Sequence, residues 1–195
     1  MIKTLINPFD NLTDNQLFFL GFAGYFVHSI FSNQWNYIAD GIIQLHQISS
    51  MPLGYSLVNN AINTLVLTLV LFIYGKIIFS KTRFIDVLNV VWFAQLTQVF
   101  LAIILFNPFV QKHTAHIQIA IENHDFQLKT VPKYELVLMG GMGILALFGI
   151  FYFFYLLVTG MKIAMNIKKK TFTILLIVIT LLVDAVLKFS YPYIL

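Results

Sequence analysis

The chain of 195 residues contains no cysteine, which excludes disulfide bonds, thiolate metal sites and cysteine nucleophiles. Charged residues are scarce, at 10% of the chain against roughly 25% in an ordinary soluble domain. Hydrophobic residues make up 59%, and the mean hydropathy is +0.84. A soluble domain of this length would lack the polar side chains to cover its surface. Composition therefore excludes a soluble globular domain, a disordered chain and a nucleic-acid-binding module, and indicates a polytopic membrane protein.

Five apolar stretches are long enough to cross a bilayer, which takes about 20 helical residues. The sequence therefore predicts an all-α integral membrane protein, a bundle of five transmembrane helices in one domain covering 1–195. The predicted spans are 14–31, 60–80, 87–106, 136–161 and 171–189. The last contains Asp184, yet the twelve Leu, Ile, Val and Phe residues of 172–187 contribute about −5 kcal/mol to insertion, against about +3 kcal/mol for one central Asp.

The basic residues predict the orientation of these spans. Placing the N-terminus inside puts eight Lys and Arg on the inner side and four on the outer side. Because inner loops are enriched in Lys and Arg, we expect a cytoplasmic N-terminus and an outside C-terminus, in the cytoplasmic membrane if the protein is bacterial. The first apolar stretch lacks a small-residue cleavage site, so we expect it to be retained as a helix.

Two outer segments are predicted to have structure of their own. Within 37–50, apolar residues recur at helical spacing, which favours a short interfacial helix over an ordinary packed loop; they are Ile38, Ile42, Leu45 and Ile48. In the outer segment 107–135, isoleucines alternate with other residues ahead of an Asn/Asp-rich turn at 123–125. That alternation predicts a small β-hairpin. Asn7-Pro8 and Asn107-Pro108 are typical of helix boundaries.

Polar residues inside the predicted spans are candidates for a binding face. Gln95 and Gln98 lie three residues apart and share one helix face. Asn63 lies in the second span, and Asp184 is four residues before Lys188 in the fifth. Hydrogen bonds between helices and a local Asp184–Lys188 salt bridge are one interpretation. A polar face for a substrate, a lipid headgroup or an ion is the other.

Small residues open the fourth predicted span. Gly140, Gly141 and Gly143 lie there and predict the close approach of another helix.

Four residues of the outer segment are candidate metal ligands: His113, His116, Glu122 and His124. The spacing lacks the H-E-x-x-H pattern, and residues three apart point to opposite faces of an extended strand. We therefore expect exposed loop histidines, no metal and no cofactor. No recognised catalytic motif is present, so the sequence predicts a protein that is not an enzyme. A metal-dependent membrane enzyme is the less favoured alternative.

Three segments carry a resemblance to a known family: 5–9 before the first span, 81–89 leading into the third, and 155–164 before the last. On these segments the chain resembles the Yip (Ypt-interacting protein) family of small five-span membrane proteins, in its prokaryotic branch. The resemblance implies a helical bundle with a cytosolic N-terminus and, in eukaryotic relatives, membrane trafficking with Rab-type GTPases. Since only 1–13 precede the first span here, a GTPase-binding role is not expected to carry over.

The predicted function is that of a non-enzymatic membrane scaffold or accessory subunit. Its expected partners are the lipid bilayer and other membrane protein subunits or a second copy of itself, and not nucleic acid. The alternative is a small transporter or lipid-handling protein that uses the intramembrane polar face, formed by Gln95, Gln98, Asn63 and Asp184.

Overall fold

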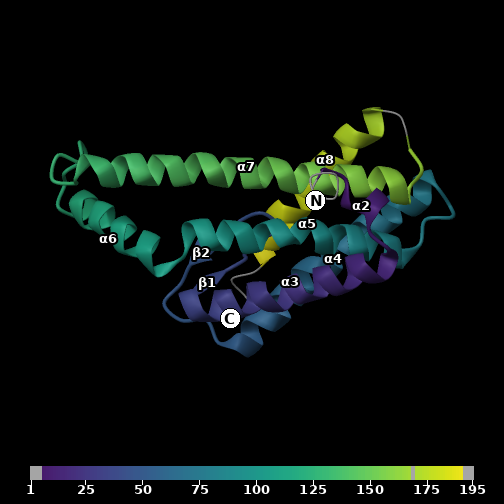
Figure 1. Ribbon diagram of the computed structural model, residues 1–195, viewed down its shortest axis with the longest axis horizontal. Helices are drawn as coiled ribbons and strands as arrows, with labels where there is room; N and C mark the ends of the chain where they lie inside the picture. The colour runs from purple at the N-terminus through teal and green to yellow at the C-terminus, as the bar shows by residue number, and fades with distance from the viewer. Residues whose placement is uncertain (1–5, 168–169, 191–195) are drawn as a thin grey trace.

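The computed structural model describes residues 6–167 and 170–190. It is built from long helices (Figure 1), and each predicted span overlaps one of them. The long helices are α3 (Asp14–Trp35), α4 (Leu53–Ile78), α5 (Phe84–Leu105), α7 (Lys133–Ala164) and α8 (Lys170–Ser190). The shorter elements are α2 (Pro8–Asn11), α6 (Pro108–Glu122) and the two-residue strands β1 (Tyr37–Ile38) and β2 (His46–Gln47).

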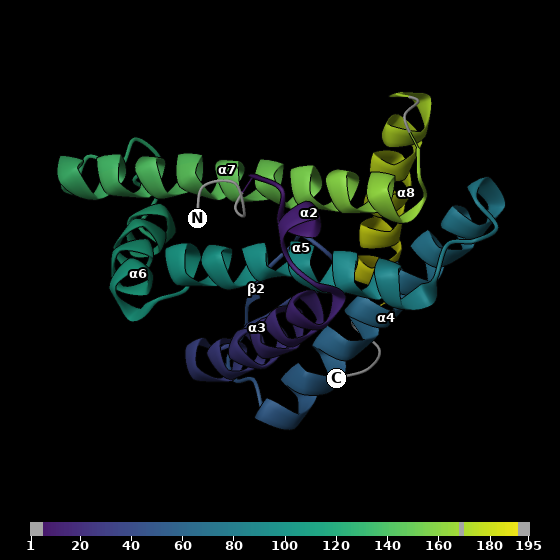
Figure 2. The same cartoon turned by 45° about the vertical axis from the view of Figure 1, so that its right-hand side comes forward.

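Helix α5 lies at the centre of the bundle and packs against α3, α4 and α7. Helix α8 packs against α4 and α7 and crosses α7 steeply in Figure 2. The main buried cluster joins α4, α5, α7 and α8 through apolar side chains, among them Leu67, Leu71, Val91, Leu157 and Leu176. This core fixes how α4, α5, α7 and α8 lie against one another, and it thereby positions the polar residues described below.

Glycine permits the close contact between α3 and α5. A Cβ atom added to Gly21 would lie 2.6 Å from the Cβ of Trp92, and one added to Gly24 would lie 2.0 Å from a methyl group of Leu96. Small residues at such contacts let helix backbones approach in a membrane. No other helix of the described chain makes a close approach at Gly140, Gly141 and Gly143, because beyond their own helix backbone no atom lies within 4 Å of a Cβ added at any of the three.

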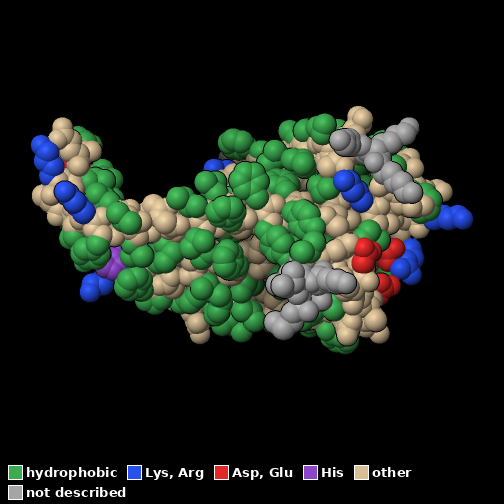
Figure 3. Space-filling model, turned by 45° about the horizontal axis from the view of Figure 1, so that its top comes forward, with side chains coloured by type: hydrophobic (Ala, Val, Ile, Leu, Met, Phe, Trp, Pro, Cys, Tyr) green, Lys and Arg blue, Asp and Glu red, His purple; other side chains and the backbone are tan. Residues whose placement is uncertain are grey.

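Four described helices are long and apolar enough to cross a membrane: α4, α5, α7 and α8 from Thr171. Helix α3 is not among them, although it has 22 residues. Apolar side chains cover large parts of the visible surface between the two ends of the molecule (Figure 3). Such a surface suits lipid rather than water, so the protein is an integral membrane protein.

The start of α3, the turn between α4 and α5 and the end of α7 lie together at one end of the bundle. Arg83, at the turn between α4 and α5, contacts Asp14 at the start of α3 with a nitrogen–oxygen distance of 3.2 Å. A hollow beside this pair is also lined by Gly160 and Ile163 near the end of α7. Helix α6 lies at the opposite end (Figure 1).

The prediction of an interfacial helix within 37–50 is wrong. The segment instead makes a two-residue antiparallel pairing, Tyr37 with Gln47 and Ile38 with His46. Its apolar side chains turn into the bundle, where Ile42 is fully buried. Burial of the extended chain among α4, α5 and α8 outweighs the local helical periodicity that motivated the prediction.

The predicted β-hairpin in 107–135 is also wrong, because α6 is a helix. Asn107 caps it by accepting hydrogen bonds from the backbone N–H groups of Phe109 (3.0 Å) and Val110 (3.1 Å), and Pro108 occupies the first turn. Asn and Pro favour these positions, and they outweigh the alternating isoleucines. The Asn107-Pro108 helix boundary is thus confirmed, as is Asn7-Pro8 at the start of α2.

Candidate functional site

The loop between α3 and α4 enters the bundle and is held there by Asp184 of α8. The Asp184 carboxylate accepts hydrogen bonds from the backbone N–H groups of Ile42 (2.6 Å) and Ile43 (2.9 Å). Its second oxygen accepts one from the side-chain amide of Gln44 (3.0 Å). Asp184 is 5% exposed, so its buried oxygens find their partners in the loop rather than in water. The predicted salt bridge to Lys188 is not the interaction that Asp184 makes.

The opposite side of the same loop is held by α4 and α5. The side-chain amide of Asn63 donates to the carbonyl oxygens of Ala39 (2.8 Å) and Gly41 (3.0 Å). The side-chain amide of Gln98 donates to the carbonyl oxygen of Ile42. Donors on α4 and α5 and an acceptor on α8 therefore hold one strip of backbone from both sides.

The depth of this loop explains why it needs so many partners. Asn63 lies ten residues into α4, which corresponds to about 15 Å along the helix axis. Irregular backbone that is buried inside a protein, away from water, needs partners for its N–H and C=O groups. The polar residues within the spans supply those partners for the loop.

Gln95, the remaining predicted site residue, lies beside this arrangement. Its side-chain oxygen accepts a hydrogen bond from the hydroxyl of Thr64 (2.7 Å). Gln95, Gln98 and Asn63 line a common void of about 10 Å³, the space that one water molecule needs. The structure thus brings Asn63, Gln98 and Asp184 onto one loop and places Gln95 beside the first two. The void that Asn63, Gln95 and Gln98 share has the volume of a water molecule and not of an organic substrate.

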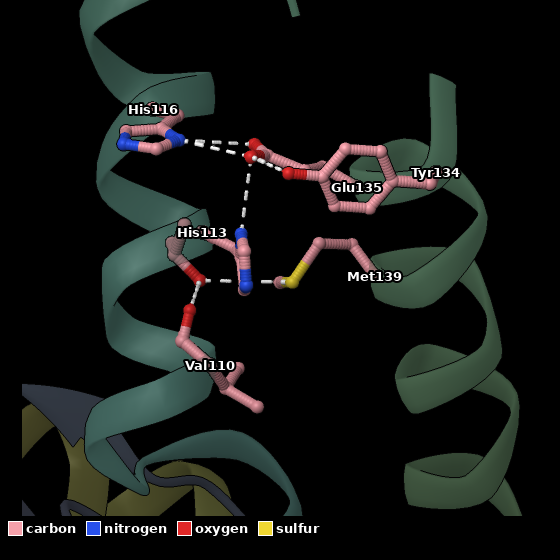
Figure 4. A network of polar contacts seen from close by, with 7 residues as sticks. Val110, His113, His116, Tyr134, Glu135 and Met139 are labelled. Atoms are coloured by element: carbon pink, nitrogen blue, oxygen red, sulfur yellow. Dashed lines mark hydrogen bonds and ion pairs between the residues drawn. The ribbon is translucent and has the colours of Figure 1, made fainter. Parts of the chain in front are cut away.

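A second polar cluster joins α6 to α7 (Figure 4). The Nδ1 atom of His113 lies 3.1 Å from a carboxylate oxygen of Glu135, and the Nδ1 atom of His116 lies 3.0 Å from it. The Tyr134 hydroxyl donates to the same oxygen at 3.1 Å. Glu135 is 2% exposed and His113 7%, whereas the His116 side chain is 46% exposed.

Only part of this cluster was visible in the sequence. His113 and His116 were singled out there, but Glu122 and His124 are exposed and do not join them. Glu135 was missed because it lies 19 residues beyond His116. The helix α6 puts residues three apart on one face, which removes the objection that rested on an extended strand. A helical H-x-x-H pair facing a buried carboxylate on the next helix was the available signal.

The turn after α6 fixes how the two helices meet. Asp125 accepts hydrogen bonds from the backbone N–H and the hydroxyl of Thr130, both at 2.8 Å. The backbone N–H of Thr130, followed by its hydroxyl, holds the pKa of Asp125 below its usual range. This turn brings the first turn of α7, with Glu135, against the His113–His116 face of α6.

The fold and these polar clusters define a class, the polytopic α-helical membrane proteins. The Yip1 domain model matches residues 15–189, which is most of the chain, so the chain belongs to the Yip1 domain family. This match confirms the resemblance to the Yip family stated from the sequence, and the prokaryotic branch stays a prediction. No curated protein and no solved structure matches the chain.

Proposed function

We propose that this protein is a non-enzymatic integral membrane scaffold or accessory subunit. The observation that carries the proposal is that Asp184, Asn63 and Gln98 bind backbone groups of the chain's own loop. Side chains used in this way stabilise one conformation of the chain, and their polar atoms are occupied by the loop instead of a solute. The Yip1 domain family is not a known enzyme family, which is consistent with this role.

The proposal includes five membrane spans, with α3 as the first. The buried residues of α3 include His28, Ser29 and Ser32, and these polar side chains lower the hydropathy of a helix whose outward side chains are apolar. Those outward side chains are Phe19, Leu20, Phe22, Phe26, Val27 and Ile30. Five spans and the basic turns at one end support a cytoplasmic N-terminus and an outside C-terminus, in the inner membrane if the protein is bacterial.

The first half of α7 is the surface that we propose for a partner helix. Gly140, Gly141 and Gly143 lie there with no atom of the described chain within 4 Å of an added Cβ. Apolar residues such as Ile144 and Phe148 beside them are exposed by 59% and 66%. Small residues next to apolar ones form the flat contacts that membrane helices use. The proposed occupant is a transmembrane helix of another subunit or of a second copy.

The test is the mass of the protein purified in a mild detergent, measured by light scattering with the detergent subtracted. We expect a particle heavier than one chain of 22.4 kDa. Gly141→Leu places a bulky side chain on the proposed surface and should reduce the mass to that of one chain. Gly54→Leu is the matched control, since Gly54 also has open space around it, and should leave the mass unchanged.

Two results would contradict parts of this proposal, the first the scaffold role itself and the second the partner surface on α7. One is a wild-type particle with the mass of one chain and no second protein. The other is an equal mass for Gly141→Leu and wild type, which would place the partner elsewhere.

One observation favours lipid handling as the second candidate function. An apolar groove of about 430 Å³ lies between α5 and α7, and its lining includes Phe93, Phe100, Phe148 and Tyr152. An acyl chain would suit it, because the groove offers almost no polar atoms to a solute. Photo-crosslinking from a reactive analogue at Phe100 should then capture one phospholipid reproducibly. Equal labelling at Ile73, which is 59% exposed on α4, would show ordinary lipid contact instead.

A further inference from the structure

We propose that His113, His116 and Glu135 form a binding site for a divalent transition metal ion such as Zn²⁺. The three residues each offer one ligand atom, and these atoms all lie within 4.8 Å of one another. Zinc binds histidine nitrogen and carboxylate oxygen at about 2.0–2.2 Å, so ligand atoms across a tetrahedral ion are about 3.4 Å apart. The two nitrogen–oxygen distances here, 3.1 and 3.0 Å, need only a small adjustment to admit the ion.

The charge balance at Glu135 supports a cation. A buried carboxylate is costly unless a positive group pairs with it. Among the described residues, the ion-pair partners of Glu135 are the two histidines, and no Lys or Arg lies within salt-bridge distance of it. A metal ion among the three side chains supplies the positive charge and leaves both imidazoles in the neutral form that binds metals.

The geometry of His113 points the same way. Its Nδ1 atom is buried and makes no hydrogen bond in the described chain, although it lies 3.1 Å from the carboxylate oxygen of Glu135. The nitrogen and the oxygen are thus close enough for an ion pair, but their relative direction does not suit a hydrogen bond. A buried imidazole nitrogen without a hydrogen-bond partner, close to a carboxylate oxygen, is placed as a metal ligand would be.

The surroundings hold the ligands in place and leave one position open. Spacing of three residues on α6 puts both imidazoles on the face that meets α7, and the Tyr134 hydroxyl restrains the Glu135 carboxylate. His116 borders an open hollow of about 380 Å³. Water from this hollow can complete a four-coordinate shell. The donor set favours zinc, copper, nickel or iron over magnesium or calcium, which prefer oxygen ligands.

The experiment is a calorimetric titration of the full chain in detergent with ZnCl₂ after chelator treatment, using a purification tag without histidine. We expect one ion bound per chain, with no competition from Mg²⁺ or Ca²⁺. Co²⁺ in place of Zn²⁺ should give a visible absorption band with the intensity of a tetrahedral nitrogen–oxygen site. His116→Gln and Glu135→Gln should each weaken Zn²⁺ binding at least about ten-fold, because each removes a ligand.

His124→Gln and Glu122→Gln are the matched controls, since both residues are exposed, lie nearby and stand outside the cluster. They should bind Zn²⁺ as the wild type does. Glu135 is buried and its variant can unfold, so the decision rests on His116→Gln, whose side chain is half exposed, with its melting temperature in chelator as the folding check. Absence of saturable Zn²⁺ binding by the wild type, or equal affinity in His116→Gln and His124→Gln, overturns the proposal.

Discussion

A carboxylate oxygen of Asp184 accepts a hydrogen bond of 2.6 Å from the backbone N–H of Ile42, a residue 142 positions earlier in the sequence. The same oxygen accepts a hydrogen bond of 2.9 Å from the backbone N–H of Ile43. Helix α8 therefore holds the loop between α3 and α4 in place. This contact closes the bundle, because α3 and α8 are the first and last of its long helices. An acidic residue inside a predicted span here has a structural partner that the chain itself provides.

Replacing Asp184 by Leu should release the loop from the bundle. Two buried backbone donors lose their acceptor, at a cost of roughly 1–3 kcal/mol each. Because the chain has no cysteine, Ile42→Cys is a clean reporter of the loop's burial. We expect Ile42→Cys to react slowly with a maleimide in otherwise wild-type protein and much faster when Asp184→Leu is added.

Asp184→Asn is the matched control for this experiment, since its side-chain oxygen can still accept from Ile42. Its amide would oppose the amide of Gln44, so a small increase in reactivity is expected. Equal protection of the cysteine in Asp184→Leu and wild type would show that the loop is held by other contacts.

A methyl group at Gly41, on the loop side of the Asp184 contact, should also release the loop from the bundle. A Cβ atom there would lie 2.4 Å from a carboxylate oxygen of Asp184 and 3.2 Å from its backbone oxygen. The backbone oxygen cannot rotate away, so Gly41→Ala should lower the melting temperature and expose Ile42→Cys. Gly54→Ala, with open space around it, should leave both measurements unchanged. A Gly41→Ala protein with the melting temperature of wild type would contradict the close contact.

The long helices could be predicted from the sequence because apolar runs of about 20 residues carry a strong signal. The partners of Asp184 could not, because the hydrogen bonds go to backbone atoms of a loop 142 residues away. No side-chain pattern encodes which carbonyl or amide such a loop presents. The helical spacing of the apolar residues in 37–50 was therefore interpreted as a helix. In the structure these residues belong to a loop that folds into the bundle.

The cluster of His113, His116 and Glu135 was not predicted from the sequence for a local reason. The alternating isoleucines of 117–121 outweighed Asn107-Pro108 in the prediction, although that pair caps a helix directly. Once α6 is taken as a strand, His113 and His116 point apart and a common ligand is excluded. Because a strand was predicted where the chain is helical, neither the shared helix face of His113 and His116 nor their contact with Glu135 was recognised.

The two glutamines of α5 should respond differently to substitution. Gln98→Leu removes the donor to the buried carbonyl oxygen of Ile42 and should destabilise the protein by roughly 1–3 kcal/mol. Gln95→Leu loses one contact with Thr64, and hydrogen bonds between membrane helices average about 0.6 kcal/mol. Unfolding in a denaturing detergent series measures both. A transport defect in a fully stable Gln95→Leu, Gln98→Leu protein would favour the binding-face interpretation instead.

The five-span topology makes a prediction about four single-cysteine variants. Asn15 and Ser80 are exposed residues at the Arg83 end of the bundle, and His46 and His124 are exposed residues beyond the other ends of α3 and α6. If α3 crosses the membrane, a maleimide that cannot enter intact cells should label His46→Cys and His124→Cys. Asn15→Cys and Ser80→Cys should react only after the cells are made permeable.

Comparing Asn15→Cys with His46→Cys isolates α3, because α3 is the one helix that runs between these two positions in the chain. Opposite labelling requires α3 to span the bilayer despite its buried His28, Ser29 and Ser32. Equal labelling would leave four spans, α4, α5, α7 and α8. The two ends of the chain would then lie on the same side, and the proposed orientation would have to be abandoned. Ser80→Cys and His124→Cys serve as fixed references, because α5 separates them under either outcome.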